Sequence, residues 1–132
     1  MRIRMLVAAG LMGISAASFA VANGEWLKKV PQAERKRLNP FAGQPDAVAA
    51  GRNLFLANCA QCHGKNAEGK GSRPNLLSER IRGASDGDIA WLLKNGEVFK
   101  GMPRWSGLPE EERWQIIAYI RSLNEQKPEG QQ

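Results

Sequence analysis

The motif C-x-x-C-H, formed by Cys59, Cys62 and His63, uses both cysteines and the single histidine of a chain of 132 residues. At this spacing each thiol can add across a vinyl group of haem, and the imidazole that follows can ligate the iron. A structural zinc site needs four protein ligands, and the chain has three thiolate or imidazole donors. A thioredoxin-like dithiol would need a βαβ pattern that the chain lacks, and a structural disulfide would leave the histidine without a role. The motif therefore predicts one covalently bound haem c, with His63 as an iron ligand.

Met102 is the strongest candidate for the second axial ligand of that iron. The other three methionines lie within the first 12 residues of the chain. Gly101 before it lets the backbone approach closely, and Pro103 after it stiffens the loop. An open iron position and ligation by Lys100 are the alternatives to a histidine–methionine pair.

The beginning of the chain has the pattern of an export signal. A basic start, Met1–Arg4, precedes an apolar stretch, Met5–Ala22, which ends in small residues that fit a cleavage site before Val21 or Asn23. We therefore expect a periplasmic protein that is soluble after cleavage, because thioether haem is normally attached outside the bacterial cytoplasm. An uncleaved membrane anchor is the alternative, although the stretch is marginal for spanning a bilayer.

The basic charge is concentrated near the N-terminus. Without Arg2 and Arg4 of the leader, 17 of the 19 basic side chains remain against 13 acidic ones, a net charge of +4. Five basic and two acidic residues of this set lie in the arm 23–45, so +3 of the +4 belongs to the arm. Such an arm could contact an acidic partner or a membrane surface, but a solvated tether is the simpler interpretation. An exported protein is not expected to bind nucleic acid.

A helix is expected from a cap at Asp46 to about Asn58. Its Val48, Gly51 and Phe55 recur at i, i+3 and i+7, which places them on one helical face. Glycine inside a helix costs about 0.5–1 kcal/mol relative to alanine, so its presence on that face suggests a close helix crossing.

Two further helices carry clear end signals. Ser85 and Asp88 form a predicted capping box, and the helix that they open should stop at Asn95–Gly96. Pro109 should begin the last helix, which continues to about Leu123. No segment alternates with period two, so the sequence predicts an all-α fold. The expected division is a signal peptide at 1–22, a basic arm at 23–45, which contains a proline-rich joint at 39–45, a domain at 46–124 and a flexible tail at 125–132.

These motifs, taken in order, resemble class I monohaem cytochromes c. The residues that carry the resemblance span 46–123: Gly51, Phe55, Cys59–His63, Pro74–Leu76, Gly101–Pro103, Ile116 and Tyr119. The finer pattern of 86–91, 94–96 and 101–105, with Asn39–Pro40 in the arm, is similar to small cytochromes c found beside quinoprotein or other periplasmic dehydrogenases. The resemblance implies three to five helices wrapped around one covalently bound haem.

The resemblance also implies specific contacts. The helix face of Gly51 and Phe55 would cross Ile116 and Tyr119 of the last helix. The carbonyl of Pro74 would accept a hydrogen bond from His63 Nδ1, which orients the imidazole. Trp91 and Trp105 would pack on the haem or lie near its propionates, although core packing explains Trp91 equally well. The expected cofactor-binding set is Cys59, Cys62, His63, Pro74, Met102 and Trp105, with His63 and Met102 as metal ligands.

We therefore expect a one-electron carrier rather than an enzyme. It would accept electrons from a periplasmic dehydrogenase and pass them to an oxidase or another cytochrome. One alternative is a fixed subunit of a dehydrogenase or oxidase complex that is strapped by the basic arm. Another is a haem enzyme or gas sensor with a displaceable Met102, against which stands the absence of a distal histidine. Membrane contact is expected only through an uncleaved leader or the arm.

Overall fold

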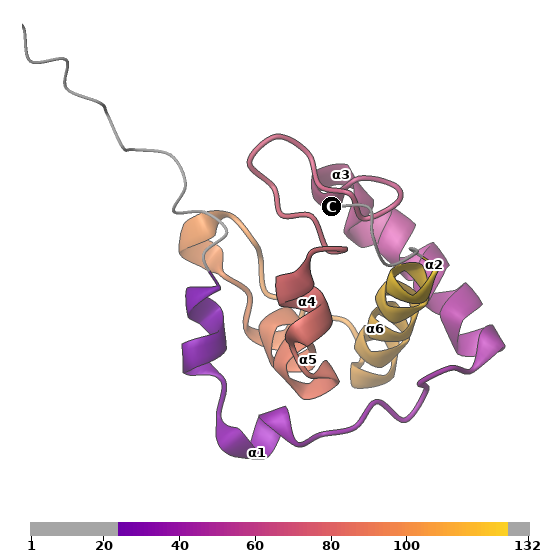
Figure 1. Ribbon diagram of the computed structural model, residues 1–132, viewed down its shortest axis with the longest axis horizontal. Helices are drawn as coiled ribbons and strands as arrows, with labels where there is room; N and C mark the ends of the chain where they lie inside the picture. Colours follow the sequence, from indigo (N-terminus) through magenta and orange to yellow (C-terminus); the bar gives the residue numbers. More distant parts are fainter. Residues whose placement is uncertain (1–23, 127–132) are drawn as a thin grey trace, which may run out of the picture.

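The computed structural model describes residues 24–126, which form an all-α domain (Figure 1). Three main helices, α2 (Pro45–Asn58), α5 (Asp86–Asn95) and α6 (Glu110–Glu125), make up the core of the fold. Shorter elements connect and surround them: η2 (Glu25–Lys29), α1 (Gln32–Arg35), α3 (Ala60–His63), α4 (Glu79–Gly83) and η3 (Val98–Lys100). Extended pairing in the described residues is limited to two isolated bridges, Lys70 with Arg73 and Glu97 with Met102. The predicted all-α class is confirmed.

Helices α2 and α6 cross at Gly51, as the resemblance implied. A Cβ atom at this position would overlap the backbone carbonyl of Gln115, so only glycine permits the observed approach. One turn further along, the rings of Phe55 and Tyr119 pack with centroids 5.4 Å apart and planes tilted by 58°. Ile116 lies in the same interface and is fully buried. The crossing fixes the direction in which α2 delivers the residues that follow it.

Most of the predicted helix ends are present. The Ser85 hydroxyl accepts from the Asp88 N–H at 3.0 Å, while the Asp88 carboxylate accepts from the Ser85 N–H at 2.9 Å, which completes the capping box. Gly96 is the C-cap of α5, with φ of 66°.

Two predicted helix starts are wrong by one or two residues. Asp46 is not a cap, because Gln44 occupies that position and Pro45 is already helical, so Asp46 lies in the first turn, where its charge suits the helix dipole. Pro109 is itself the N-cap of α6, which begins at Glu110. The extended conformation of Pro109, with ψ of 148°, leaves it outside the helix.

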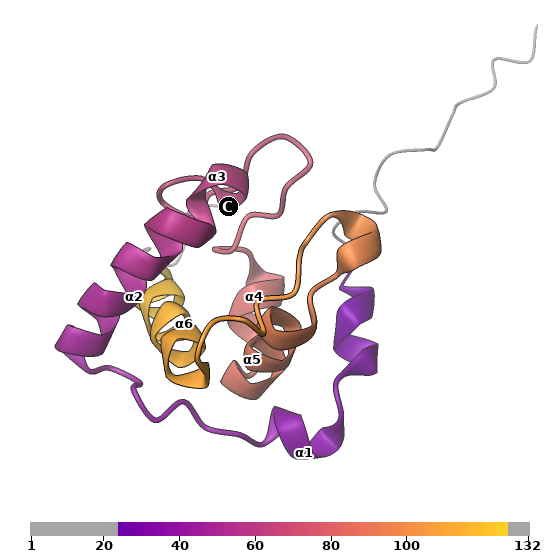
Figure 2. The same ribbon diagram turned by 180° about the vertical axis from the view of Figure 1, so that it is seen from behind.

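The N-terminal segment 24–44 packs on the rest of the domain, so its interpretation as a solvated tether is wrong. Trp26 and Val30 are only 7% and 5% exposed and belong to the main hydrophobic cluster. Further along, the Ser85 hydroxyl donates to the carbonyl of Arg35 at 2.9 Å. The Asn39 side chain donates to the carbonyl of Trp114 at 3.0 Å. Figures 1 and 2 show the segment following the edge of the helical bundle before it enters α2. Within the segment, η2 and α1 each form a single short helical turn.

Val30→Ala should lower the free energy of unfolding by about 2 kcal/mol, because it removes two buried methyl groups and leaves a small void. Leu38→Ala is the matched control, since Leu38 lies in the same segment but is 86% exposed. Chemical denaturation of the two variants measures the difference. Equal stability of both would contradict the packing of this segment.

Parts of the expected domain organisation lie outside the described residues. The signal peptide at 1–22 is among them, as is most of the tail at 125–132, whose first residue ends α6. Within 24–126, no helix is both long and apolar enough to cross a bilayer.

Candidate cofactor site

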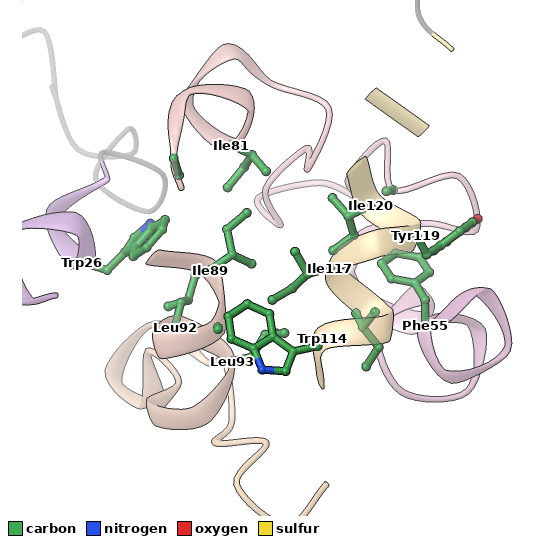
Figure 3. Packing of buried hydrophobic residues seen from close by; sticks show 14 of the residues in the cluster. Trp26, Phe55, Ile81, Ile89, Leu92, Leu93, Trp114, Ile117, Tyr119 and Ile120 are labelled. Atoms are coloured by element: carbon green, nitrogen blue, oxygen red, sulfur yellow. The ribbon is translucent and has the colours of Figure 1, made fainter. Parts of the chain in front are cut away.

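A cavity of about 310 Å³ lies between the three main helices and the N-terminal segment. Its walls are mostly apolar and come from distant parts of the chain: Trp26, Phe55, Ile81, Ile89, Leu92, Leu93, Ile116 and Ile120. Figure 3 shows how several of these side chains face a common interior from different elements. All six residues predicted to bind the cofactor also line this cavity: Cys59, Cys62, His63, Pro74, Met102 and Trp105.

The two cysteines lie where α2 passes into α3. Cys59 is at once the C-cap of α2 and the N-cap of α3. Its carbonyl accepts from the N–H groups of Cys62 at 3.2 Å and His63 at 2.9 Å, which winds the motif into one helical turn. The two cysteines are not joined in a disulfide bond. Burial, with a smaller contribution from Cys62, raises the pKa of the Cys59 thiol to about 11, so this thiol stays neutral in its apolar surroundings.

His63 is oriented by the loop that follows it. Its Nδ1 lies 2.9 Å from the carbonyl oxygen of Pro74, the contact that the resemblance implied. Because a carbonyl only accepts, Nδ1 carries the proton in this pairing and Nε2 keeps its lone pair for a metal. The loop is itself held by backbone bonds, including Gly69 N–H to the carbonyl of His63 at 2.7 Å. The imidazole is therefore prepared to act as a ligand.

Met102 comes from a different side of the cavity, at the end of a tight hairpin. Its N–H donates to the carbonyl of Glu97 at 3.1 Å, and its carbonyl accepts from the N–H of Glu97 at 3.0 Å. Gly101 makes the turn possible because its φ of 83° lies in the left-handed region. The hairpin presents the methionine to the cavity wall.

The two tryptophans considered from the sequence have different positions. Trp105 lines the cavity, and its backbone N–H donates to the carbonyl of Leu93 at 2.8 Å, which ties the methionine loop to α5. Trp91 packs against the hydrophobic cluster and is not part of the cavity wall. Core packing is therefore the role that the structure supports for Trp91.

Sequence reasoning missed several residues of the site. Trp26 forms part of the wall. Its segment shows no helical periodicity, and the basic charge of the segment favours interpretation as a solvated tether. Arg73 and Arg80 also line the cavity, and an Arg73 N–H reaches the carbonyl of Gly101 at 3.4 Å. Their cationic groups suit the carboxylates of a bound molecule such as haem. The sequence gives only a weak sign of this role, because the direction in which a basic side chain points depends on the tertiary structure.

Glu97 is the acidic residue of the cavity wall, and it too was missed. Its carboxylate is held by Lys29 at 2.8 Å and Lys100 at 3.1 Å. The hydrogen bond from Lys29, followed by that from Lys100, lowers the pKa of Glu97 despite an opposing effect of burial. Glu97 is therefore a paired carboxylate rather than a free acid or base at the site.

The donor set of the cavity fits a thioether-bound haem. A flat apolar macrocycle needs an apolar chamber, two thiols close to a histidine for covalent attachment, and soft or imidazole ligands to iron. The chamber, the adjacent Cys59 and Cys62, the oriented His63 and Met102 supply each of these.

A family model described as "Cytochrome C oxidase, cbb3-type, subunit III" matches residues 46–120, more than half of the chain. The chain belongs to this family of monohaem c-type cytochromes. The family implies a covalently bound haem c and a role in electron transport. The resemblance stated from the sequence is thereby confirmed at the level of the family.

Curated relatives of this cytochrome include both small cytochromes and larger oxidase subunits. Cytochrome c550 of Pseudomonas aeruginosa is 30% identical over an alignment that covers 86% of this chain and 90% of the relative. Cytochrome c-554(547) of Halothiobacillus neapolitanus is 39% identical, with 58% of this chain and 96% of the relative covered. The cbb3-type oxidase subunit CcoP of Rubrivivax gelatinosus is 35% identical over 64% of this chain, which spans only 28% of that larger protein. The cytochrome is thus similar to small electron carriers over nearly their whole length.

Proposed function

We propose that this cytochrome is a periplasmic one-electron carrier whose haem is attached through Cys59 and Cys62 and ligated by His63 and Met102. The single observation that carries the proposal is the common cavity. Its wall brings together the thiols, an imidazole oriented by Pro74 and the thioether of a hairpin 39 residues beyond His63. The export signal expected at 1–22 supports the periplasmic location, because thioether haem is normally attached outside the bacterial cytoplasm.

Bound haem would supply an iron that cycles between ferric and ferrous states. The Pro74 carbonyl holds His63 in one tautomer and increases its basicity as a ligand. The thioether of Met102 is a poor donor to ferric iron, which favours the ferrous state and raises the reduction potential. Apolar walls keep water away from the ring. If His63 and Met102 both ligate the iron, the chain would leave no position for a substrate, which favours a carrier over an enzyme or gas sensor.

We propose that the electron donor is a periplasmic dehydrogenase and that the acceptor is an oxidase or another cytochrome. The relatives named as oxidase subunits support exchange with a respiratory chain. Val98 and Phe99, which lie within the methionine hairpin, are 54% and 107% exposed and offer an apolar contact beside the cavity. Such a small apolar contact suits a brief encounter with a redox partner.

A fixed subunit of a larger complex is the second candidate for the same electron-transfer role. The proposed strap, however, is engaged with its own domain through Trp26, Val30 and Asn39. Deleting 23–45 would therefore remove part of the cavity wall and would not separate the two candidates. Co-purification of the intact cytochrome with an oxidase or dehydrogenase does separate them: a stable stoichiometric complex identifies a subunit, and a free monohaem protein identifies a shuttle.

Met102→Ala tests the proposed ligand. Ferric wild-type protein should show the weak absorption band near the red edge of the spectrum that marks methionine ligation, and its ferrous form should not bind carbon monoxide. The variant should lose the band, bind carbon monoxide when ferrous and have a reduction potential lower by a few tenths of a volt. Val98→Ala, on the same loop but exposed, should keep all three wild-type properties. A wild-type protein that binds carbon monoxide readily would refute the proposal.

A further inference from the structure

The carboxylate of Glu97 joins two parts of the chain that are distant in sequence. Its side chain is only 10% exposed, and its oxygens contact Lys29 Nζ at 2.8 Å and Lys100 Nζ at 3.1 Å. Lys100 is three residues away and belongs to the same loop, whereas Lys29 comes from η2, 68 residues earlier. The Lys29 contact is therefore a tertiary link between the N-terminal segment and the loop of the methionine.

The backbone of the same glutamate holds the methionine in place. Glu97 and Met102 exchange two hydrogen bonds, and the carbonyl of Glu97 accepts a third from the N–H of Lys100 at 2.8 Å. When the backbone of Met102 withdraws from the cavity, this hairpin opens or moves as a unit. Either motion displaces Glu97 relative to Lys29. The ion pair between Lys29 and Glu97 therefore stabilises the closed form of the loop, in which Met102 lines the cavity.

Lys29, at the other end of this ion pair, belongs to an element that is anchored in the hydrophobic core. Trp26 and Val30 on either side of Lys29 are buried in the hydrophobic cluster. The Arg35 guanidinium donates to the carbonyls of Leu27 and, at 3.2 Å, of Val30, which fastens η2 to α1. Lys29 therefore projects from an element that is anchored in the core, whereas η3 of the methionine hairpin buries no side chain. Movement of the hairpin away from the cavity would therefore stretch the contact between Lys29 and Glu97.

We infer that Lys29 and Glu97 are positioning residues for the axial methionine, and that η2 latches the Met102 hairpin over the cavity. The inference rests on the proposed role of Met102 as the sixth ligand. Its consequence is that the N-terminal segment sets how readily an external ligand replaces the methionine. The latch acts through the backbone of the hairpin and supplies no ligand to the iron.

Lys29→Ala in the haem-loaded protein tests the latch. Ferric protein is titrated with imidazole at a fixed pH of about 8, where imidazole is neutral, and loss of the methionine band is followed. Apparent affinity for imidazole should rise about two- to fivefold, which is the effect of losing an ion pair whose lysine is 60% exposed from the closed form. Lys29→Arg should restore the wild-type value because it retains the charge and the donor.

Lys28→Ala is the matched control. It makes the same charge change in the same element, but Lys28 pairs with Glu25 at 3.0 Å rather than with Glu97, so imidazole affinity should stay at the wild-type value. In a Glu97→Gln background, Lys29→Ala should have little further effect, because its partner has already lost its charge. The thermal midpoint is recorded for every variant to separate ligand positioning from general stability.

Three possible results would each overturn one of the proposals. A wild-type protein without the methionine band would overturn the proposed ligation itself, before the latch is tested. Retention of the band with equal imidazole affinity in wild type and Lys29→Ala would overturn the latch alone, whether or not the thermal midpoint falls. An effect of Lys28→Ala equal to that of Lys29→Ala would reduce the result to net charge and would also overturn it.

Discussion

A haem-free chain with Cys59→Ser and Cys62→Ser is expected to be largely unfolded at 25 °C. Without haem the interior retains a chamber of about 310 Å³. The wall of this chamber is mostly apolar and has no partner when haem is absent, so the haem-free chain loses several kcal/mol at about 25 cal/mol per Å² of apolar surface left unburied. Small domains are stable by about 5–15 kcal/mol in total, so the loss removes much or all of the stability.

Far-ultraviolet circular dichroism and thermal unfolding measure this effect. The haem-loaded wild-type protein, prepared in the same buffer, is the reference and should unfold cooperatively. A haem-free double variant that keeps near-native helicity and melts in one sharp transition would show that side chains alone complete the core. The apolar character of the cavity wall, with Ile89, Ile116 and Ile120 among its residues, argues against that result.

Gly51→Ala is expected to destabilise the haem-loaded protein by about 4 kcal/mol, at the severe end of overpacking effects. The added methyl group would overlap the backbone carbonyl of Gln115, and no rotamer change can relieve contact with main chain. Helices α2 and α6 would have to separate, which disturbs the contact between Phe55 and Tyr119. The motif that begins at Cys59 would shift with them.

Gly83→Ala is the control for this substitution. Gly83 is also helical, at the end of α4, but open space surrounds the position of its missing Cβ. Alanine there should be neutral or slightly stabilising because it restricts the unfolded chain. Denaturant unfolding of both variants gives the comparison. Similar stabilities for Gly51→Ala and Gly83→Ala would mean that the helix crossing tolerates a larger residue.

Much of the fold could be predicted from the sequence because helix ends and helix faces depend on neighbouring residues. The capping box at Ser85 depends on atoms within four residues, so sequence and structure agree there. The helical face of Gly51 and Phe55 was also correct, because periodicity alone decides which residues share a face. The error at Asp46 has the same local character: proline at the first helical position shifted the cap back to Gln44.

The N-terminal segment shows where such reasoning failed. Its charge and its prolines suggested a solvated tether, yet Trp26 and Val30 are buried and Lys29 reaches Glu97. One tryptophan and one valine make no periodic pattern, and the other buried members of the hydrophobic cluster that they join come from later in the chain, between Phe55 and Ile120. Burial of this kind is a property of the assembled domain.

The amino-acid sequence by itself determined the cofactor chemistry, because two thiols, one imidazole and one methionine beyond the leader leave few combinations of donors. It also determined the helical class through periodicity and end signals. Tertiary structure alone decided which side chains enclose the cavity and what holds the methionine hairpin closed. Those features depend on contacts between distant segments, which arise when apolar surface is buried on folding.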